Sequence, residues 1–416
     1  MRPIYRWLLL ALAALIVLPL AAVLCVMLWV DPNRFRAPIE NAARERLGLP
    51  LQLQGDLAWQ WWPLLSMSAS GGRINDRAGG EPLLLWQKLE FGARWPALVR
   101  QRLEVDALRI DGLQLRLQRD AQGRGNWQSL AEQVGARLDA RGAAAAPGTG
   151  PDSGQASFTL ASLQLRDASI HLDDAGTGRQ WRADGLQFQA ALGYAPGSGT
   201  LQLDAPRLRA TLAAGDAAGQ SWELNFESPQ LRLDTRTPSL DAANWRLQLA
   251  GLQLDGTQLE PLRFEPLSGA GQLKFSTASI RELLQRLGVQ PPPTRDNDAL
   301  GKLDGELGWT LTAGRLDLQP LQLEADDTTF SGLAMWPLDD TGPALLELHG
   351  DHADFDRYRR PEDQPGEPFE LPVEKLRAID LEGEVSFNTA TLFGVTLRGA
   401  KFHLYSDRGV AAASRR

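Results

Sequence analysis

The sequence predicts a mainly β protein that begins with a transmembrane helix and has only a few other, short helices. Three observations support this fold class: an uncharged apolar run near the amino terminus, an alternation of apolar and polar residues over most of the remaining chain, and short turn-forming pairs within that alternation. Apolar side chains at every second position are typical of strands that bury one face. The 416 residues suffice for two or three domains or for one extended repetitive domain.

The first element is the uncharged run WLLLALAALIVLPLAAVLCVMLWV at residues 7–30. A helix rises about 1.5 Å per residue, so this run can cross a hydrocarbon core of about 30 Å. A cleaved signal peptide would have a shorter apolar region and an A-x-A-like site after it. Lipid attachment at Cys25 would need a small residue where Leu24 stands. We therefore expect an uncleaved anchor over residues 1–30, whose orientation the flanking arginines leave open.

Two helices are expected in the rest of the chain. Asp31-Pro32 is a typical helix start, and apolar residues recur at helical spacing between Pro38 and Gly48. The second helix is predicted over TASIRELLQRL at residues 277–287, which Gly288 ends.

From Leu51 onward the apolar period is two, which predicts half-buried strands that are mainly antiparallel. The phrases LRIDGLQLRL, LQLRDASIHL and LQLDGTQL are alike, which indicates one supersecondary unit used repeatedly. The candidate residues that line an apolar groove are Leu113, Leu115, Leu117, Leu163, Leu165, Leu186, Phe188, Leu224, Phe226, Leu247 and Leu249.

Turn signals separate the predicted strands. Asp-Gly pairs favour two-residue hairpin turns, and Gly123 and Gly125 in the phrase GRGNW allow a reversal with positive φ, in which Asn126 satisfies the turn backbone. The expected hairpin turns are Asp111-Gly112, Asp184-Gly185, Asp255-Gly256, Asp304-Gly305 and Asp407-Arg408-Gly409.

Three interruptions rich in Pro, Gly or Ala divide the alternating region: residues 136–157, the linker PPPTRDND at 291–298 and the loop at 361–368. The expected organisation is an anchor (1–30), a helix with the first strands (31–135), a flexible linker (136–157), a central β region (158–290), a second linker (291–298) and a carboxyl-terminal β region (299–416).

A sheet with one apolar face must cover that face. One solution is a sandwich or solenoid whose faces bury each other, and the other is a curved open sheet whose concave apolar face holds an apolar ligand. Periodicity alone leaves both solutions open.

Composition and motifs argue against several function classes. Forty-three Lys and Arg against fifty-one Asp and Glu give a net charge of −8, which disfavours a nucleic-acid partner or electrostatic docking on anionic lipid. Cys25 is the single cysteine, so no intramolecular disulfide can form. The chain has no G-x-S-x-G, no P-loop motif and no G-x-G-x-x-G after a strand. We therefore expect no enzyme activity, no catalytic residues and no cofactor.

The cluster HGDHADFD at residues 349–356 is the one pattern that suggests a metal site. In a strand, His349 and Asp351 share one face while His352 and Asp354 share the other, and two ligands on each face make an incomplete site. A structural or surface role is favoured and no metal site is predicted; a metal-dependent enzyme at His349 and His352 is the less favoured alternative.

Several segments together resemble the AsmA family of Gram-negative envelope proteins. They are the anchor followed by VDPNRFRAPIENAARERLGLPLQLQGDLAWQWWP, then LEVDALRIDGLQLRLQRDAQGRGNWQSL, SIRELLQRLGVQPPPT, LQLEADDTTFSGLAMWP and HADFDRYRRP, so the resemblance extends over about residues 1–405. The resemblance implies an inner-membrane protein with a periplasmic β-rich body that takes part in outer-membrane biogenesis. Larger relatives are regarded as bridge-like proteins that transfer lipid along a β-groove, and the family carries no catalytic residues.

The alternation and the resemblance together predict an elongated, curved antiparallel sheet of the repeating β-groove type. Its implied partners are the inner-membrane bilayer and a phospholipid ligand, and its location is the inner membrane with the body in the periplasm. The alternative is a closed-core envelope factor that regulates outer-membrane protein assembly through protein contacts. The family also leads us to expect strands beyond LEGEVSFNTATLFGVTLRGAKFHLYSDRG, so Leu397–Tyr405 would be a terminal strand of a truncated relative, or one whose edge an envelope protein completes.

Overall fold

The computed structural model describes residues 32–47, 50–60, 66–75, 82–93, 105–128, 158–195, 198–214, 221–287, 289–338, 342–361 and 380–405. The chain divides into two compact units. Unit 1 comprises residues 1–152 and 162–180, and unit 2 comprises residues 153–161 and 181–416. Most described residues lie in strands, so the expected mainly β class is confirmed.

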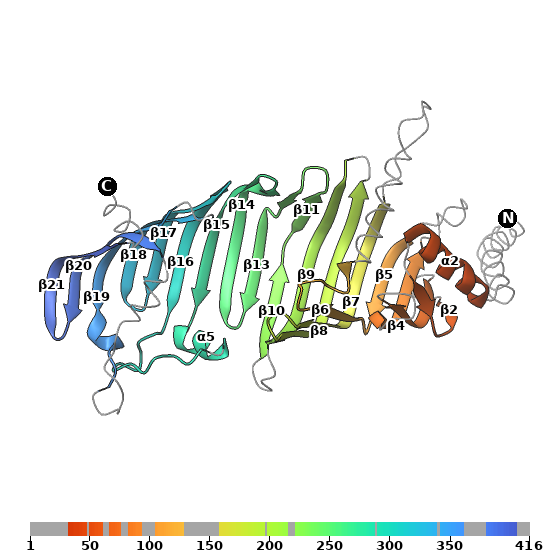
Figure 1. Cartoon of the computed structure of the whole chain (residues 1–416), viewed down its shortest axis with the longest axis horizontal. Coiled ribbons are helices and arrows are strands. Elements are labelled where there is room, and N and C mark those ends of the chain that lie inside the picture. Colours follow the sequence, from red (N-terminus) through yellow and green to blue (C-terminus); the bar gives the residue numbers. More distant parts are fainter. Residues whose placement is uncertain are drawn as a thin grey trace, which may run out of the picture. The chain divides into compact units, whose positions relative to one another are not determined.

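The described part of unit 1 starts with two helical segments and continues as a sheet, coloured red to yellow in Figure 1. Its strands β1 and β2 both pair with β3, β3 pairs with β4, and β4 pairs with β5 and β6, all antiparallel. The elements are η1 (Pro32–Phe35), α2 (Arg36–Leu47), β1 (Leu51–Leu53), β2 (Leu57–Gln60), β3 (Ser66–Asn75), β4 (Pro82–Ala93), β5 (Val105–Asp111), β6 (Gln114–Arg119) and β7 (Phe158–Asp174).

Side chains from the helix and several strands form a closed core in unit 1. Leu53, Leu57, Ala69 and Trp86 are buried, and Ile39 of α2 packs against them. Side chains of the helical segments hold the helix on the sheet, because they accept hydrogen bonds from the backbone of the first strands.

Two of these bonds join the helical segments to the first strands. Leu53 donates its backbone N–H to Glu40 Oε1 at 2.8 Å, and Leu57 donates to Asn33 Oδ1 at 3.1 Å. The helix predicted between Pro38 and Gly48 is therefore present, and it covers one face of the first strands.

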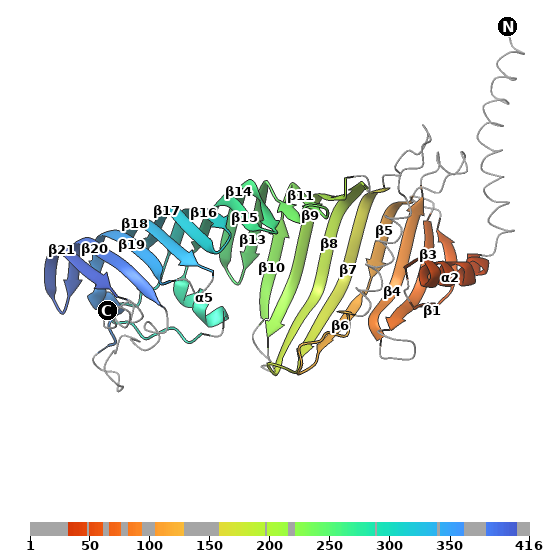
Figure 2. The ribbon, with the colours of Figure 1, turned by 45° about the horizontal axis from the view of Figure 1, so that its top comes forward.

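Unit 2 is a single sheet in which most neighbours in sequence are also neighbours in space; Figure 2 shows its strands side by side in one layer. All described pairings in it are antiparallel except β19 with β20. Its elements are β8 (Arg179–Ala195), β9 (Thr200–Ala214), β10 (Ser221–Glu227), β11 (Gln230–Asp234), β12 (Ser239–Asp241), β13 (Asn244–Leu249), β14 (Leu252–Phe264), β15 (Leu267–Thr277), α5 (Ile280–Arg286), β16 (Leu303–Thr312), β17 (Arg315–Ala325), β18 (Thr328–Pro337), β19 (Ala344–Asp354), η2 (Phe355–Tyr358), β20 (Leu381–Leu392) and β21 (Val395–Leu404).

The strands are mainly antiparallel, as expected, but three pairings are parallel. Strands β5 and β6 both run parallel to β7, and β19 runs parallel to β20. Parallel neighbours need a long connection that returns the chain to the starting end of the sheet. The long connections at 120–157 and 355–380 supply it, so these interruptions of the alternation mark crossovers.

The four Asp-Gly pairs that lie within the described residues do not form the expected hairpin turns. Asp184-Gly185 lies at an irregularity inside β8, and Gly112 joins β5 to β6, which both pair with β7. Asp255-Gly256 and Asp304-Gly305 lie within β14 and β16. The fifth expected turn, Asp407-Arg408-Gly409, lies outside the described residues.

Other pairs make the turns. Ala250-Gly251 and Phe393-Gly394, for example, connect adjacent antiparallel strands, and all four residues have positive φ. Such φ values suit the twist of a two-residue hairpin.

The second predicted helix is present as α5. Ser279 is its N-cap and accepts a hydrogen bond from the backbone N–H of Glu282 at 3.1 Å. The expected linker at 291–298 lies inside unit 2, where Thr294 is buried and Arg295 donates its backbone N–H to the carbonyl of Arg359 at 2.6 Å.

Several expected segments lie outside the described residues, namely the anchor run at 7–30, the linker at 136–157 and most of the loop at 361–368. Within the described ranges, every helix is too short or too polar to span a bilayer.

Candidate functional site

One face of unit 2 carries a continuous line of apolar residues, which we call the first apolar row. Its members are direct cross-strand partners, and direct partners project from the same face of a sheet. The row crosses β8, β9, β10 and β13–β21 in order. Its residues are Phe188, Leu208, Phe226, Leu247, Leu254, Phe275, Gly305, Leu323, Phe330, Gly350, Phe387 and Ala400.

A second apolar row runs beside the first on the same face, two residues away along each strand. It crosses β13–β21. Its residues are Trp245, Gly256, Leu273, Leu307, Leu321, Gly332, Leu348, Val385 and Phe402. The two rows together make a wide apolar stripe that runs perpendicular to the strands.

The opposite face of the same strands is polar. The residues next to the first apolar row are again direct partners: Gln189, Arg207, Glu227, Arg246, Asp255, Lys274, Glu306, Gln322, Ser331, His349, Ser386 and Lys401. The sheet of unit 2 therefore has one polar face and one apolar face.

Ion pairs stabilise the polar row. Arg246 contacts Asp255 at 2.6 Å, and Lys274 contacts Glu306 at 3.3 Å. Burial opposes ionisation of Asp255, but hydrogen bonds from Gln253 and Arg246 outweigh it and hold the pKa of Asp255 below its ordinary value. Exposed pairs of this kind contribute up to about 1 kcal/mol each.

Glycines in the apolar rows leave room for neighbouring aromatic rings. A Cβ added at Gly256 would lie 2.0 Å from Trp245 Cε2, and one added at Gly305 would lie 2.3 Å from Phe275 Cζ. The Asp-Gly pairs at these positions therefore place an aromatic ring over the strand, which explains why they occur inside strands.

The apolar stripe is not buried under a second layer among the residues that the structure describes. Most large side chains of the two rows are half-buried, each covered by its neighbours within the sheet. In β8–β21 the buried leucine and phenylalanine side chains are Leu186, Leu321 and Phe387, and most other buried apolar residues are alanines. The arrangement offers a wide, one-sided apolar surface.

The candidate groove residues are distributed over both units. In unit 2, Phe188, Phe226 and Leu247 belong to the first apolar row, Leu224 and Leu249 are direct partners on the same face, and Leu186 is buried beside an irregularity of β8. In unit 1, the partnered pairs are Leu115 with Ile170, Leu117 with Leu172, Leu163 with Leu108 and Leu165 with Ile110, while Leu113 packs against the closed core.

Sequence reasoning missed the carboxyl-terminal part of the first apolar row. Phe275, Phe330 and Phe387 belong to it, but Gly305 and Gly350 interrupt the visible alternation around them. No local signal marks these positions, because the register of the sheet decides which glycine lies opposite each phenylalanine.

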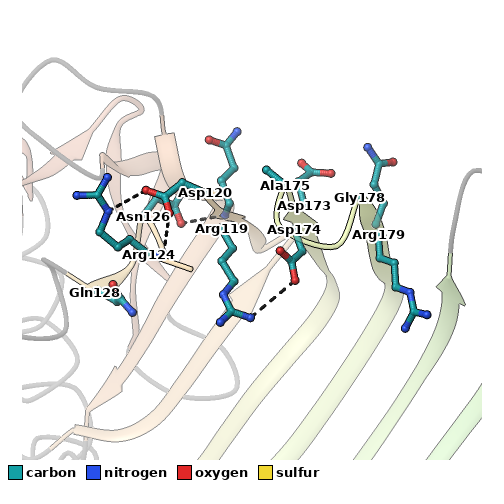
Figure 3. A pocket seen from close by; sticks show the side chains of 13 residues that line it. Arg119, Asp120, Arg124, Asn126, Gln128, Asp173, Asp174, Ala175, Gly178 and Arg179 are labelled. Carbon is teal, nitrogen blue, oxygen red and sulfur yellow. Dashed lines mark hydrogen bonds and ion pairs between the residues drawn. The ribbon is translucent and has the colours of Figure 1, made fainter. Parts of the chain in front are cut away.

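Unit 1 holds a polar cleft of about 920 Å³ beside the GRGNW loop (Figure 3). Arg119 pairs with Asp174 at 3.7 Å, and Arg124 pairs with Asp120 at 2.9 Å. The backbone N–H of Arg124 contributes most to holding the pKa of Asp120 below its ordinary value. Because these guanidinium charges are paired with carboxylates, the two arginines offer little net charge to an anionic ligand.

The GRGNW loop differs in part from its expected conformation. Gly123 has a φ of 82°, but Gly125 does not have positive φ; a Cβ there would lie 2.6 Å from the Trp127 ring. Asn126 bonds the backbone of β6 at Arg116 and Gln118 instead of satisfying the turn.

The acidic residues of HGDHADFD bind backbone groups. Asp351 accepts the N–H of Thr329 at 2.9 Å, and Asp354 accepts the N–H of Asp356 at 3.0 Å. His349 contacts Ser386 at 3.1 Å on the polar face. Within the described ranges, no three His, Cys, Asp or Glu residues gather as metal ligands would.

The model of the AsmA family matches residues 1–360. The chain belongs to the AsmA family. It is also similar to Protein AsmA of Escherichia coli (strain K12), with 27% identity over 106 residues. That match covers 26% of this chain and 17% of the E. coli protein.

Segments that carry the AsmA resemblance meet at one end of the unit 2 strands. Asp326, between β17 and β18, accepts the N–H groups of Leu300 and Gly301 at 3.0 and 2.7 Å. It also accepts the hydroxyl proton of Tyr358 at 2.6 Å. Burial and the bond to Asp326 raise the pKa of Tyr358, so this hydroxyl stays a hydrogen-bond donor. Asp326 and Tyr358, which belong to segments that resemble the AsmA family, thus join the ends of neighbouring strands.

Proposed function

We propose that this AsmA-family chain holds phospholipid acyl chains along the apolar rows of unit 2 and serves outer-membrane biogenesis. The observation that carries the proposal is the one-sided sheet, in which a continuous apolar row is directly backed by a continuous polar row. An acyl chain needs an extended apolar surface and no specific polar site. The two apolar rows provide such a surface.

The physical driving force is the burial of methylene groups. Each buried CH₂ contributes about 0.8 kcal/mol, so a chain of ordinary length gains several kcal/mol from partial burial alone. A polar headgroup remains in water at the margin of the stripe. This binding requires no catalytic residue, cofactor or nucleic acid.

The proposed location is the inner membrane, with the β-rich body in the periplasm. The uncharged run at 7–30 would be the anchor, and family membership supports an envelope-associated role. The bilayer would then be both the attachment site and a source of phospholipid.

Site-specific photo-crosslinking in intact cells tests the proposal. p-Benzoylphenylalanine replaces Leu247 in the first apolar row or, as a matched control, its neighbour Gln248 on the polar face. We expect phospholipid adducts by mass spectrometry at position 247 and none at position 248. Lipid adducts at neither position, or equal amounts at both, would contradict acyl-chain binding by the rows.

The second candidate function is regulation of outer-membrane protein assembly through protein contacts. It is favoured by β21, which pairs with β20 on one side and whose Val395 and Phe402 side chains are 57% and 44% exposed. An edge strand offers backbone N–H and C=O groups to another chain. The same crosslinker at Leu397 is expected to capture an envelope protein if this function holds, and its failure to capture any protein would exclude an edge partner.

A further inference from the structure

The apolar rows change character at β18–β21, where phenylalanines fill the face. Phe387 of β20 is only 4% exposed, and its ring lies edge-on to Phe330 and Phe402, with centroid distances of 5.9 and 6.2 Å. Gly350 makes room for the cluster, because a Cβ there would lie 2.5 Å from Phe387 Cδ1. This part of the stripe has a local closed core.

One ring of the cluster does not come from the sheet. Phe355 belongs to η2 and packs edge-on against Phe387 at a centroid distance of 5.4 Å and an interplanar angle of 85°. Because η2 follows β19, it carries Phe355 over a row that the sheet itself would leave uncovered. The ring therefore covers the first apolar row at Phe387, whose own ring packs against Phe330 of β18.

Charged contacts fix η2 in this position. Arg357 contacts Asp296 at 2.5 Å and also pairs with Asp327. Asp356 accepts the N–H groups of Phe393 and Gly394 at 2.8 and 2.7 Å. We call these contacts the rim clamp. They join the 291–298 segment and two strand-connecting turns to η2, so Phe355 is held from several sides.

We propose that Phe355 is an aromatic barrier that ends the acyl-chain path at about β18, so that lipid occupies β8–β17 and not β19–β21. This proposal rests on the proposed function and deepens it, since it names the residue that sets how far a bound chain reaches. Phe355 acts as a positioning residue, and the rim clamp sets its place.

The test compares two positions on the apolar face in the full-length chain. p-Benzoylphenylalanine replaces Leu247 in the first apolar row on β13 or Leu348 in the second apolar row on β19. In otherwise unchanged protein we expect phospholipid adducts at position 247 and at least a tenfold lower yield at position 348. Phe355→Ala should raise the yield at position 348 towards that at 247 and leave position 247 unchanged, whereas Phe355→Leu, which keeps an apolar cover, should preserve the contrast.

The outcomes separate the barrier from the function on which it rests. Equal adduct yields at 247 and 348 in protein with Phe355 unchanged would overturn the barrier proposal. This comparison does not depend on whether a Phe355 variant folds. An unchanged low yield at 348 in a folded Phe355→Ala protein, judged by its melting temperature, would also overturn it. Loss of adducts at 247 itself would instead reject lipid binding, and the barrier with it.

Discussion

Unit 1 and unit 2 use the same alternation of apolar and polar residues but cover their apolar faces differently. In unit 1, α2 brings Ile39 onto the sheet, and Leu53, Leu57 and Trp86 are buried beneath it. In the described part of unit 2, most residues of the apolar rows remain half-buried, and η2 covers their end near Phe387.

This contrast shows that the period of a strand predicts which side chains share a face but not what covers that face. Cover comes from elements with another period, such as α2 and η2, and each is held by its own polar contacts. A face without such cover can bind an apolar ligand, and one with cover is a core.

Replacing the buried tryptophan of unit 1 should have the largest effect. Trp86 is 6% exposed and lies over Gly72, where an added Cβ would be 2.0 Å from its ring. Trp86→Ala should lower the free energy of unfolding by about 3–5 kcal/mol, measured by hydrogen exchange within unit 1. Trp181→Ala, at a 45% exposed tryptophan, should cost about 0.5 kcal/mol or less. Similar losses for both variants would contradict a closed core in unit 1.

A side chain at a row glycine should have the next largest effect. In Gly305→Val the new Cβ would lie 2.3 Å from Phe275 Cζ, so the ring must move. We expect this substitution to lower the free energy of unfolding by about 1–3 kcal/mol. Gly193→Val in β8 is the matched control, because no atom lies within 4 Å of its added Cβ. Valine favours strands, so this control should be neutral or stabilising in a urea titration. Equal destabilisation by both substitutions would argue against ring packing on Gly305.

The strands of both units could be predicted from the sequence because period-two alternation is local information. Leu247 and Leu249, for instance, are recognisable from their own segment, and so is the Ser279-capped helix. The pairs Asp255-Gly256 and Asp304-Gly305 were misread because a hairpin and a glycine beneath an aromatic ring have the same two-residue signal. The ring over Gly305 comes from Phe275, on the neighbouring strand across an intervening helix.

The cover of the apolar face could not be predicted from the sequence. Phe355 meets Phe387 only because β20 runs parallel to β19 after a long crossover, and no local pattern specifies that step. The rim clamp likewise joins Arg357 to Asp296, a residue that the sequence assigned to a linker. Such pairings depend on the register of the whole sheet.

A polar residue within the first apolar row tests directly whether the stripe is open. Leu247→Asn should cost about 1 kcal/mol in unfolding free energy, because the leucine is already partly solvated, while the yield of bound lipid falls. Leu53→Asn in the closed core of unit 1 should cost several kcal/mol, since the amide would be buried without a partner. Urea titration of both variants measures the contrast. A loss of several kcal/mol at Leu247 would mean that the rows of unit 2 are self-filled.

The smallest effect is expected at the cover of unit 2 and depends on pH. The backbone N–H groups of Gly394 and Phe393 hold the pKa of Asp356 below its ordinary value, despite some opposing desolvation. Its stabilising contribution is therefore present above the unfolded-state pKa of about 3.9 and is lost as the pH falls through the lower folded-state pKa. Asp356→Asn should lower the melting temperature slightly at pH 7 and narrow the difference between pH 7 and pH 3. Asp173→Asn, at an exposed carboxylate of β7, is the control. Its difference in melting temperature between pH 7 and pH 3 should stay closer to that of the unchanged chain. If Asp356→Asn leaves the acid response unchanged, the carboxylate does not hold η2 over the row, and the cover must depend on Arg357 and Tyr358 instead.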